Sequence, residues 1–157
     1  MKGPVAIFTA FAAICLIAIP YFAIAGTGGQ EASPINVKPW DEDGKELFAV
    51  ACGPCHTLQA AGADGVVGPN LDNILAPGGN SNYEGSYGRA INAVTCGFGG
   101  GRMPAGILQG ENAQEVAAFV GAYAGALREG EAPLADTRTA PKAPAPDSCG
   151  AEASADN

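Results

Sequence analysis

Five consecutive residues, Cys52-Gly53-Pro54-Cys55-His56, carry the clearest chemistry in this chain of 157 residues. Positions i, i+3 and i+4 share one face of a helical turn, so both thiols and the imidazole are expected to point the same way. Two thiols at this spacing can each add across one vinyl group of a single haem, and the histidine then lies under the iron. Cys-x-x-Cys-His is the attachment motif of c-type haem. The pentad therefore predicts one covalent haem c, with His56 as an iron ligand.

Paired cysteines can also serve other chemistries. Cys-Gly-Pro-Cys is the active-site tetrapeptide of thioredoxin-like proteins, which place it after a strand in a βαβ unit. The run from 41 to 51 instead opens with acidic residues and spaces Leu47, Phe48 and Ala51 as a helix does, which predicts an amphipathic helix. A structural zinc site is disfavoured because the chain has one histidine and no second cysteine pair at suitable spacing. The haem hypothesis is favoured over both.

The second axial position of such a haem needs a ligand. The chain has two methionines, and Met1 belongs to the N-terminal apolar segment. Met103 follows a run of glycines and precedes Pro104, in a loop between two expected helices. Methionine can simply fill a gap in a core, but a glycine-rich loop offers little core to fill. The sequence therefore predicts Met103 as the second iron ligand, and His/Met ligation raises the reduction potential.

Helices separated by loops rich in glycine and proline are expected to position these groups. Four helical segments are predicted: from residue 41 into the pentad, and over 70–75, 87–96 and 112–127. The loops between them are long for an ordinary domain, but they would suit a chain wrapped around a prosthetic group. The expected fold class is all-α, with three to four helices over residues 41–130 around one haem.

Residues 5–25 form an uncharged, mostly apolar run that predicts a transmembrane helix. At about 1.5 Å per residue, the run would span the roughly 30 Å of a bilayer core. Lys2 precedes it, which favours a cytoplasmic N-terminus. Ala23-Ile24-Ala25 would also suit signal-peptide cleavage, so residues 1–25 are either a retained anchor, which we favour, or a signal segment. In both cases the haem domain is expected on the outer side of a bacterial cell membrane.

Two further segments flank the expected domain. Residues 26–40 begin with several glycines and are predicted to be a flexible tether. Residues 131–157 are rich in proline and alanine and lack a periodic apolar face, which predicts an irregular tail. The net charge of −8 makes nucleic acid an improbable partner. A basic docking patch on a redox partner is one interpretation of this acidity, and simple solubility is another.

The motifs, in their order, resemble those of a class I cytochrome c domain over residues 41–127. The resemblance rests on Gly44 and Phe48, the pentad, Gly68-Pro69-Asn70-Leu71, Met103-Pro104, and the run of Val116, Phe119 and Tyr123. It implies that the carbonyl of Pro69 accepts the ring N–H of His56 and so fixes its tautomer. It also implies that Gly44 lets the first and last helices approach closely where Phe48 meets Phe119.

Two of the five cysteines are unassigned once the pentad and Cys15 in the apolar segment are set aside. These are Cys96 and Cys149, and both would be exported. Oxidising compartments favour pairing, so a Cys96–Cys149 disulfide is expected, with two free thiols as the alternative.

The function expected from this pattern is one-electron transfer, not catalysis. A six-coordinate iron has no open site for a small-molecule substrate, and the chain has no second histidine for acid–base work. The carrier would move electrons between membrane complexes of a respiratory chain, such as a quinol-oxidising complex and a terminal oxidase. Two alternatives are a fixed haem subunit of such a complex, and a haem enzyme in which Met103 leaves the iron.

Overall fold

The structure is a computed structural model that describes residues 14–16, 35–77, 82–125, 133–144, 146 and 149. The chain divides into two compact units, residues 1–31 and residues 32–157. In the first unit, residues 14–16 have helical backbone, and the rest of the predicted 5–25 helix lies outside the described residues. Within the described ranges, no helix is long and apolar enough to cross a bilayer.

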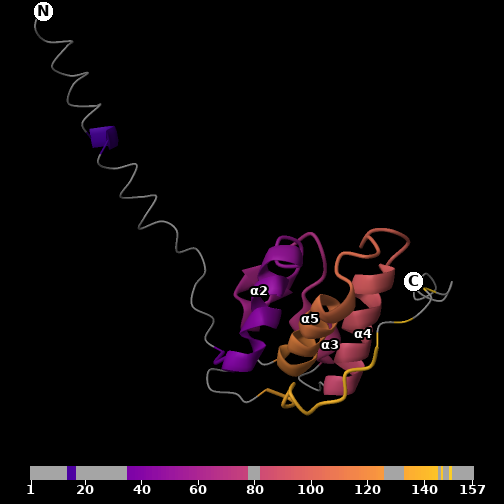
Figure 1. The fold of residues 1–157 in the computed structure, drawn as a ribbon. Helices are drawn as coiled ribbons and strands as arrows, with labels where there is room; N and C mark the ends of the chain where they lie inside the picture. The colour runs from indigo at the N-terminus through magenta and orange to yellow at the C-terminus, as the bar shows by residue number, and fades with distance from the viewer. Residues whose placement is uncertain are drawn as a thin grey trace, which may run out of the picture. The chain divides into compact units, whose positions relative to one another are not determined.

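Where the structure describes it, the second unit is built from helices, together with two short strands, β1 and β2, that sequence reasoning did not predict. Its elements are η1 (Pro39–Asp41), α2 (Glu42–Ala51), β1 (Thr57–Leu58), η2 (Gln59–Ala61), β2 (Ala63–Asp64), α3 (Leu71–Leu75), α4 (Tyr83–Cys96) and α5 (Gly110–Tyr123). Strands β1 and β2 pair antiparallel, with Thr57 opposite Asp64. Figure 1 shows α5 between α2 and α4, and α5 packs against both of them. The four predicted helical segments are all present.

Helix α4 begins earlier than its sequence pattern indicated. Asn82 caps it, because its side-chain oxygen accepts the Gly85 N–H at 2.7 Å. Tyr83 and Tyr87 then lie one turn apart on the buried face. The glycine at position 85 conceals this first turn in the sequence. Helix α5 also begins earlier than expected, and it ends earlier as well, since it runs from Gly110 to Tyr123 and not from 112 to 127.

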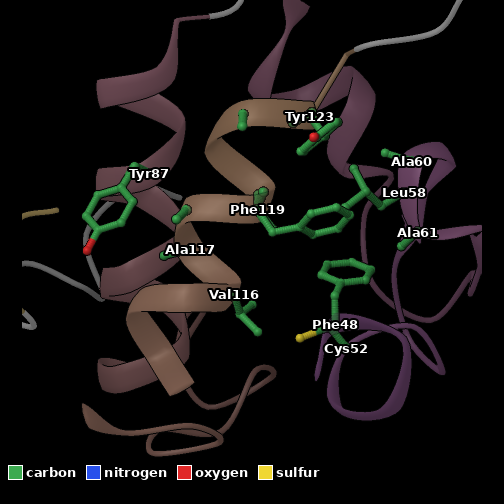
Figure 2. Close-up of a cluster of buried hydrophobic side chains, with 14 of the residues drawn as sticks. Phe48, Cys52, Leu58, Ala60, Ala61, Tyr87, Val116, Ala117, Phe119 and Tyr123 are labelled. Carbon is green, nitrogen blue, oxygen red and sulfur yellow. The ribbon is translucent and has the colours of Figure 1, made fainter. Parts of the chain in front are cut away.

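The core lies on both faces of α5, whose residues 116–123 are all buried. Such a helix must be apolar on every side. Gly44 makes the crossing with α2 possible, since a Cβ there would lie 2.8 Å from the Glu115 carbonyl oxygen and 2.9 Å from the Phe119 Cβ. The rings of Phe48 and Phe119 meet at 6.2 Å between centroids, and Cys52 lies in the same cluster (Figure 2). The close approach expected at Gly44 is therefore confirmed.

The segment before α2 corrects the predicted tether. Ile35 is 3% exposed and Val37 is 7% exposed, and both belong to the core. The end of the 26–40 segment is therefore part of the packed domain, which begins at or before residue 35 and not at 41. Two apolar residues in alternation are too short a pattern to predict this burial from sequence.

The part of the C-terminal segment that the structure describes is packed against the domain. Residues 133–144 contain no helix or strand. The Leu134 N–H nevertheless donates to the Ala122 carbonyl at the end of α5 (2.8 Å), and Thr137 is buried. We call residues 133–144 together with Cys149 the C-terminal strap. The domain thus extends beyond residue 130, which corrects the predicted boundary.

A buried carboxylate joins the segment before α2, helix α5 and the strap. The Asp41 side chain accepts the Tyr123 hydroxyl at 2.8 Å and the Thr137 hydroxyl. The Tyr123 oxygen in turn accepts the Lys38 N–H at 2.9 Å. Arg138 adds a contact outside this network, because its guanidinium lies 3.7 Å from the ring centroid of Trp40.

Candidate functional site

The pentad forms a further turn at the end of α2. The N–H groups of Cys52 and Gly53 both donate to the Phe48 carbonyl at 2.8 Å. The N–H groups of Cys55 and His56 then donate to the Cys52 carbonyl at 3.0 and 2.9 Å. The backbone therefore has the helical-turn geometry that the i, i+3, i+4 spacing predicted.

The two thiols of this turn have different surroundings. Both are free, and Cys52 is buried at 6% exposure whereas Cys55 is exposed. Burial, with a smaller contribution from Cys55, raises the pKa of the Cys52 thiol to about 11. A dithiol oxidoreductase needs the opposite, a thiol whose pKa is lowered. Moreover, the strands in the described residues both follow the pentad and are antiparallel, so the thioredoxin hypothesis has no structural support.

His56 is held by the loop that follows β2. Its Nδ1 lies 2.9 Å from the Pro69 carbonyl oxygen. Since a carbonyl can only accept, Nδ1 carries the proton and Nε2 is left with its lone pair, which is the form that binds a metal. The structure thus brings His56 and Pro69 together in the arrangement that the resemblance implied.

Two glycines of the same loop fit tightly against the pentad. A Cβ on Gly68 would overlap the His56 ring, at 2.7 Å from Nδ1 and 2.9 Å from Nε2. The Gly68 N–H also donates to the Cys55 carbonyl at 2.7 Å. Gly65, which sequence reasoning missed, is equally confined, because a Cβ there would overlap the Gly53 carbonyl oxygen and lie 2.5 Å from the Cys55 carbonyl carbon. The sequence does contain a signal for this position, because Gly62, Gly65 and Gly68 follow one another at intervals of three residues.

Met103 is presented by a short hairpin in the loop between α4 and α5, residues 97–109, which we call the Met103 loop. Phe98 and Met103 exchange both backbone hydrogen bonds at 3.1 Å. The residues between them include Gly99, Gly100 and Gly101, all with positive φ, a conformation that glycine adopts at little cost. The Met103 side chain is half-buried and packs against the hydrophobic cluster that contains Cys52.

The last two cysteines are joined. Cys96, the final residue of α4, forms a disulfide with Cys149, with 5.2 Å between the Cα atoms. This is the pairing that elimination among the five cysteines suggested. It attaches the strap directly beside the start of the Met103 loop.

These residues fit a covalent haem better than a bare metal ion. The turn offers two free thiols, the histidine has a fixed tautomer with Nε2 available, and Gly68 leaves no side chain over the ring. In contrast, the described part of the chain contains no group of three or more His, Cys, Asp or Glu side chains placed to hold a metal. The zinc alternative therefore has no support in this structure.

Comparison with known proteins agrees with this geometry. The sequence profile of the family described as cytochrome c matches residues 42–123. The chain therefore belongs to the cytochrome c family, and its cofactor is a covalently bound haem c. This membership assigns it to haem-based electron transfer.

A solved structure also resembles the chain. It is the c-type cytochrome SorU from Sinorhizobium meliloti, at 38% sequence identity, 55% coverage of this chain, 92% coverage of that chain and a TM-score of 0.43. No curated protein matches this chain significantly.

Proposed function

We propose that this protein is a one-electron carrier whose haem iron is held by His56 on one side and Met103 on the other. Bound haem supplies a one-electron couple between ferric and ferrous iron. The chain's own part is to orient the ligands. The His56–Pro69 hydrogen bond of 2.9 Å carries the proposal, because it commits Nδ1 and leaves Nε2 for the metal.

The Met103 loop supports the second half of the ligand set. The bridge to Phe98 fixes the backbone of Met103 on both sides, and its side chain already packs on the cluster that includes Cys52. A thioether favours ferrous iron and so raises the potential of a haem that histidine also holds. The proposed carrier therefore works at a higher potential than a haem held by histidine alone.

The test of the ligand set is Met103→Ala, with Phe98→Leu as its control from the same backbone bridge. The alanine variant should lose the far-red sulfur-to-iron absorption band. Its potential should fall on the order of 100 mV, part of the roughly 0.8 V range that axial ligands cover. The leucine variant should keep both properties. A Met103→Ala protein with an unchanged band and potential would refute His/Met ligation.

Electron transfer without catalysis is the second part of the proposal. With His56 and Met103 both on the iron, no position is open for a substrate, and the chain has no further histidine to act as acid or base. The competing idea is a haem enzyme in which Met103 leaves. Carbon monoxide binding to the ferrous protein separates the two, because a carrier should bind it weakly and an enzyme of that kind should bind it readily.

The membrane setting and the partners are also proposals. The 5–25 apolar run and the disulfide, which is typical of oxidising compartments, support a haem domain outside a bacterial cell membrane. Donor and acceptor would be a quinol-oxidising complex and a terminal oxidase or a similar acceptor. The net charge of −8 favours a basic surface on the partner, and rates of electron transfer should then fall as salt is added.

The alternative is a fixed haem subunit of a larger membrane complex. Extraction in mild detergent separates the two hypotheses. Stoichiometric co-migration with other subunits favours the fixed subunit, whereas migration as a single chain favours the carrier.

A further inference from the structure

The end of α4 holds the returning side of the Met103 loop as well as its start. The loop leaves directly after the last residue of the helix. It returns where the N–H groups of Gly106 and Ile107 donate to the carbonyls of Thr95 (3.0 Å) and Val94 (3.1 Å). These carbonyls belong to the last turn of the helix, where no intrahelical donor exists. The position of Met103 therefore depends on where the end of α4 lies.

The Phe98–Met103 bridge pairs the backbone inside the loop, but it does not attach the loop to the rest of the domain. The three consecutive glycines have φ values of 63°, 66° and 91°, and glycine is the most conformationally permissive residue. The last turn of α4 also carries no basic side chain to complement the helix dipole. The placement of the bridge, and of the thioether with it, therefore depends on contacts outside the loop.

The C-terminal strap supplies such contacts. The Tyr87 hydroxyl donates to the Ala143 carbonyl at 2.7 Å, and Cys149 is bonded to Cys96. Tyr87 and Cys96 are nine residues apart on α4, a rise of about 13.5 Å at 1.5 Å per residue. The six residues from Ala143 to Cys149 reach at most about 20 Å. The chain between Ala143 and Cys149 is therefore long enough to join these two points of α4, and the strap ends where the Met103 loop begins.

We propose that the strap, closed by the Cys96–Cys149 disulfide, is a positioning element for the Met103 thioether. This inference rests on the proposed role of Met103 as an iron ligand. With the link intact, the last turn of α4 and the returning loop stay paired, and the thioether stays in place. Without it, the loop opens more often, and an external ligand finds a larger open fraction to bind, so its apparent affinity rises in proportion.

The test is a titration of the ferric, haem-loaded protein with imidazole, using Cys149→Ser and Tyr123→Phe. Tyr123 lies on α5, outside both the strap and α4, and its hydroxyl bonds Asp41 and the Lys38 N–H, so Tyr123→Phe destabilises the protein without freeing the helix end. We expect imidazole to bind about tenfold more tightly to Cys149→Ser, and to change by less than about twofold for Tyr123→Phe. Hydrogen exchange at the Gly106 and Ile107 amides should accelerate in Cys149→Ser alone.

The outcomes separate positioning from general stabilisation. Equal tightening in both variants would show that only overall stability matters, and would overturn the proposal. Unchanged imidazole affinity with unchanged amide protection in Cys149→Ser would also overturn it. A wild-type protein without the sulfur-to-iron band would overturn this inference together with the ligand assignment, whereas the first two outcomes leave that assignment standing.

The disulfide can also be removed in two other ways, so that the test does not depend on Cys149→Ser alone. The disulfide of folded wild-type protein can be reduced with a phosphine and alkylated, and the iron then re-oxidised with ferricyanide before the same titration. The double variant Cys96→Ser/Cys149→Ser removes any effect of a free thiol. Both samples should reproduce the tighter imidazole binding.

Discussion

Replacing Tyr123 with phenylalanine tests the buried network that joins three separate segments of the domain. The hydroxyl donates to the Asp41 carboxylate at 2.8 Å and accepts the Lys38 N–H at 2.9 Å. A hydrogen bond to a charged group contributes about 1.5–3 kcal/mol, and an ordinary one contributes about 1 kcal/mol. Tyr123→Phe should therefore lower the free energy of unfolding by about 3 kcal/mol, a large part of the roughly 5–15 kcal/mol typical of a domain.

The chain offers a matched control in Tyr83. Within the described residues its buried hydroxyl has no hydrogen-bond partner, so Tyr83→Phe removes the same atom without breaking a hydrogen bond. Since an unsatisfied buried hydroxyl is itself costly, this variant should be neutral or slightly stabilising. The two substitutions are chemically identical, and only the network distinguishes them.

Urea unfolding of the haem-loaded protein measures both variants. The midpoint should fall for Tyr123→Phe and stay or rise for Tyr83→Phe, with the same dependence on urea concentration in each. Equal losses for the two variants would mean that ring packing, and not the hydrogen bonds to Asp41 and Lys38, controls the cost. That result would refute the role assigned to the network.

Three further predictions concern the site and the pH range. Gly68→Ala should greatly reduce covalent haem on a stained denaturing gel because its methyl group would overlap the histidine ring, whereas Gly88→Ala, where a Cβ meets nothing within 4 Å, should not. In haem-free protein, iodoacetamide should modify the exposed Cys55 before Cys52, because burial raises the pKa of the Cys52 thiol to about 11. Mass spectrometry of peptides from samples quenched at early times shows the order of modification. Equal rates at the two thiols would contradict the prediction. Burial raises the pKa of Tyr83 from 10.0 to about 12. Between these two values the folded state keeps a proton that the unfolded chain loses, so stability should be lost as pH rises from about 10 to 12. Urea midpoints over that range should fall less steeply in Tyr83→Phe than in the wild-type protein.

The pentad was predictable from the sequence because the chemistry of haem attachment fixes the spacing of its residues. Two thioethers and an axial ligand on one turn require Cys52, Cys55 and His56 at i, i+3 and i+4, and this pattern is visible in sequence. The approach of α2 to α5 was predictable for a similar reason, because Gly44 stands opposite Phe119 in a recognisable helix pair.

The strap and the buried network were not predictable in the same way. The strap is held by backbone carbonyls, such as that of Ala143, and by the single hydroxyl of Thr137, and neither contact produces periodicity. Asp41 was interpreted as one of the acidic residues that open the first helix, and nothing in the sequence indicated that the structure would bury it. Whether a polar side chain is buried depends on partners far away in sequence, and Thr137 is one of them.

The disulfide between Cys96 and Cys149 also determines to which part of the fold a group fused to the C-terminus is attached. A fluorescent reporter or a fused enzyme placed after Asn157 is tied, through the disulfide eight residues earlier, to the end of α4 and not to the end of α5. Truncating the chain after α5 would remove this link along with the contacts of the strap to Asp41 and Tyr87. Expression designs should therefore keep residues 35–149 together.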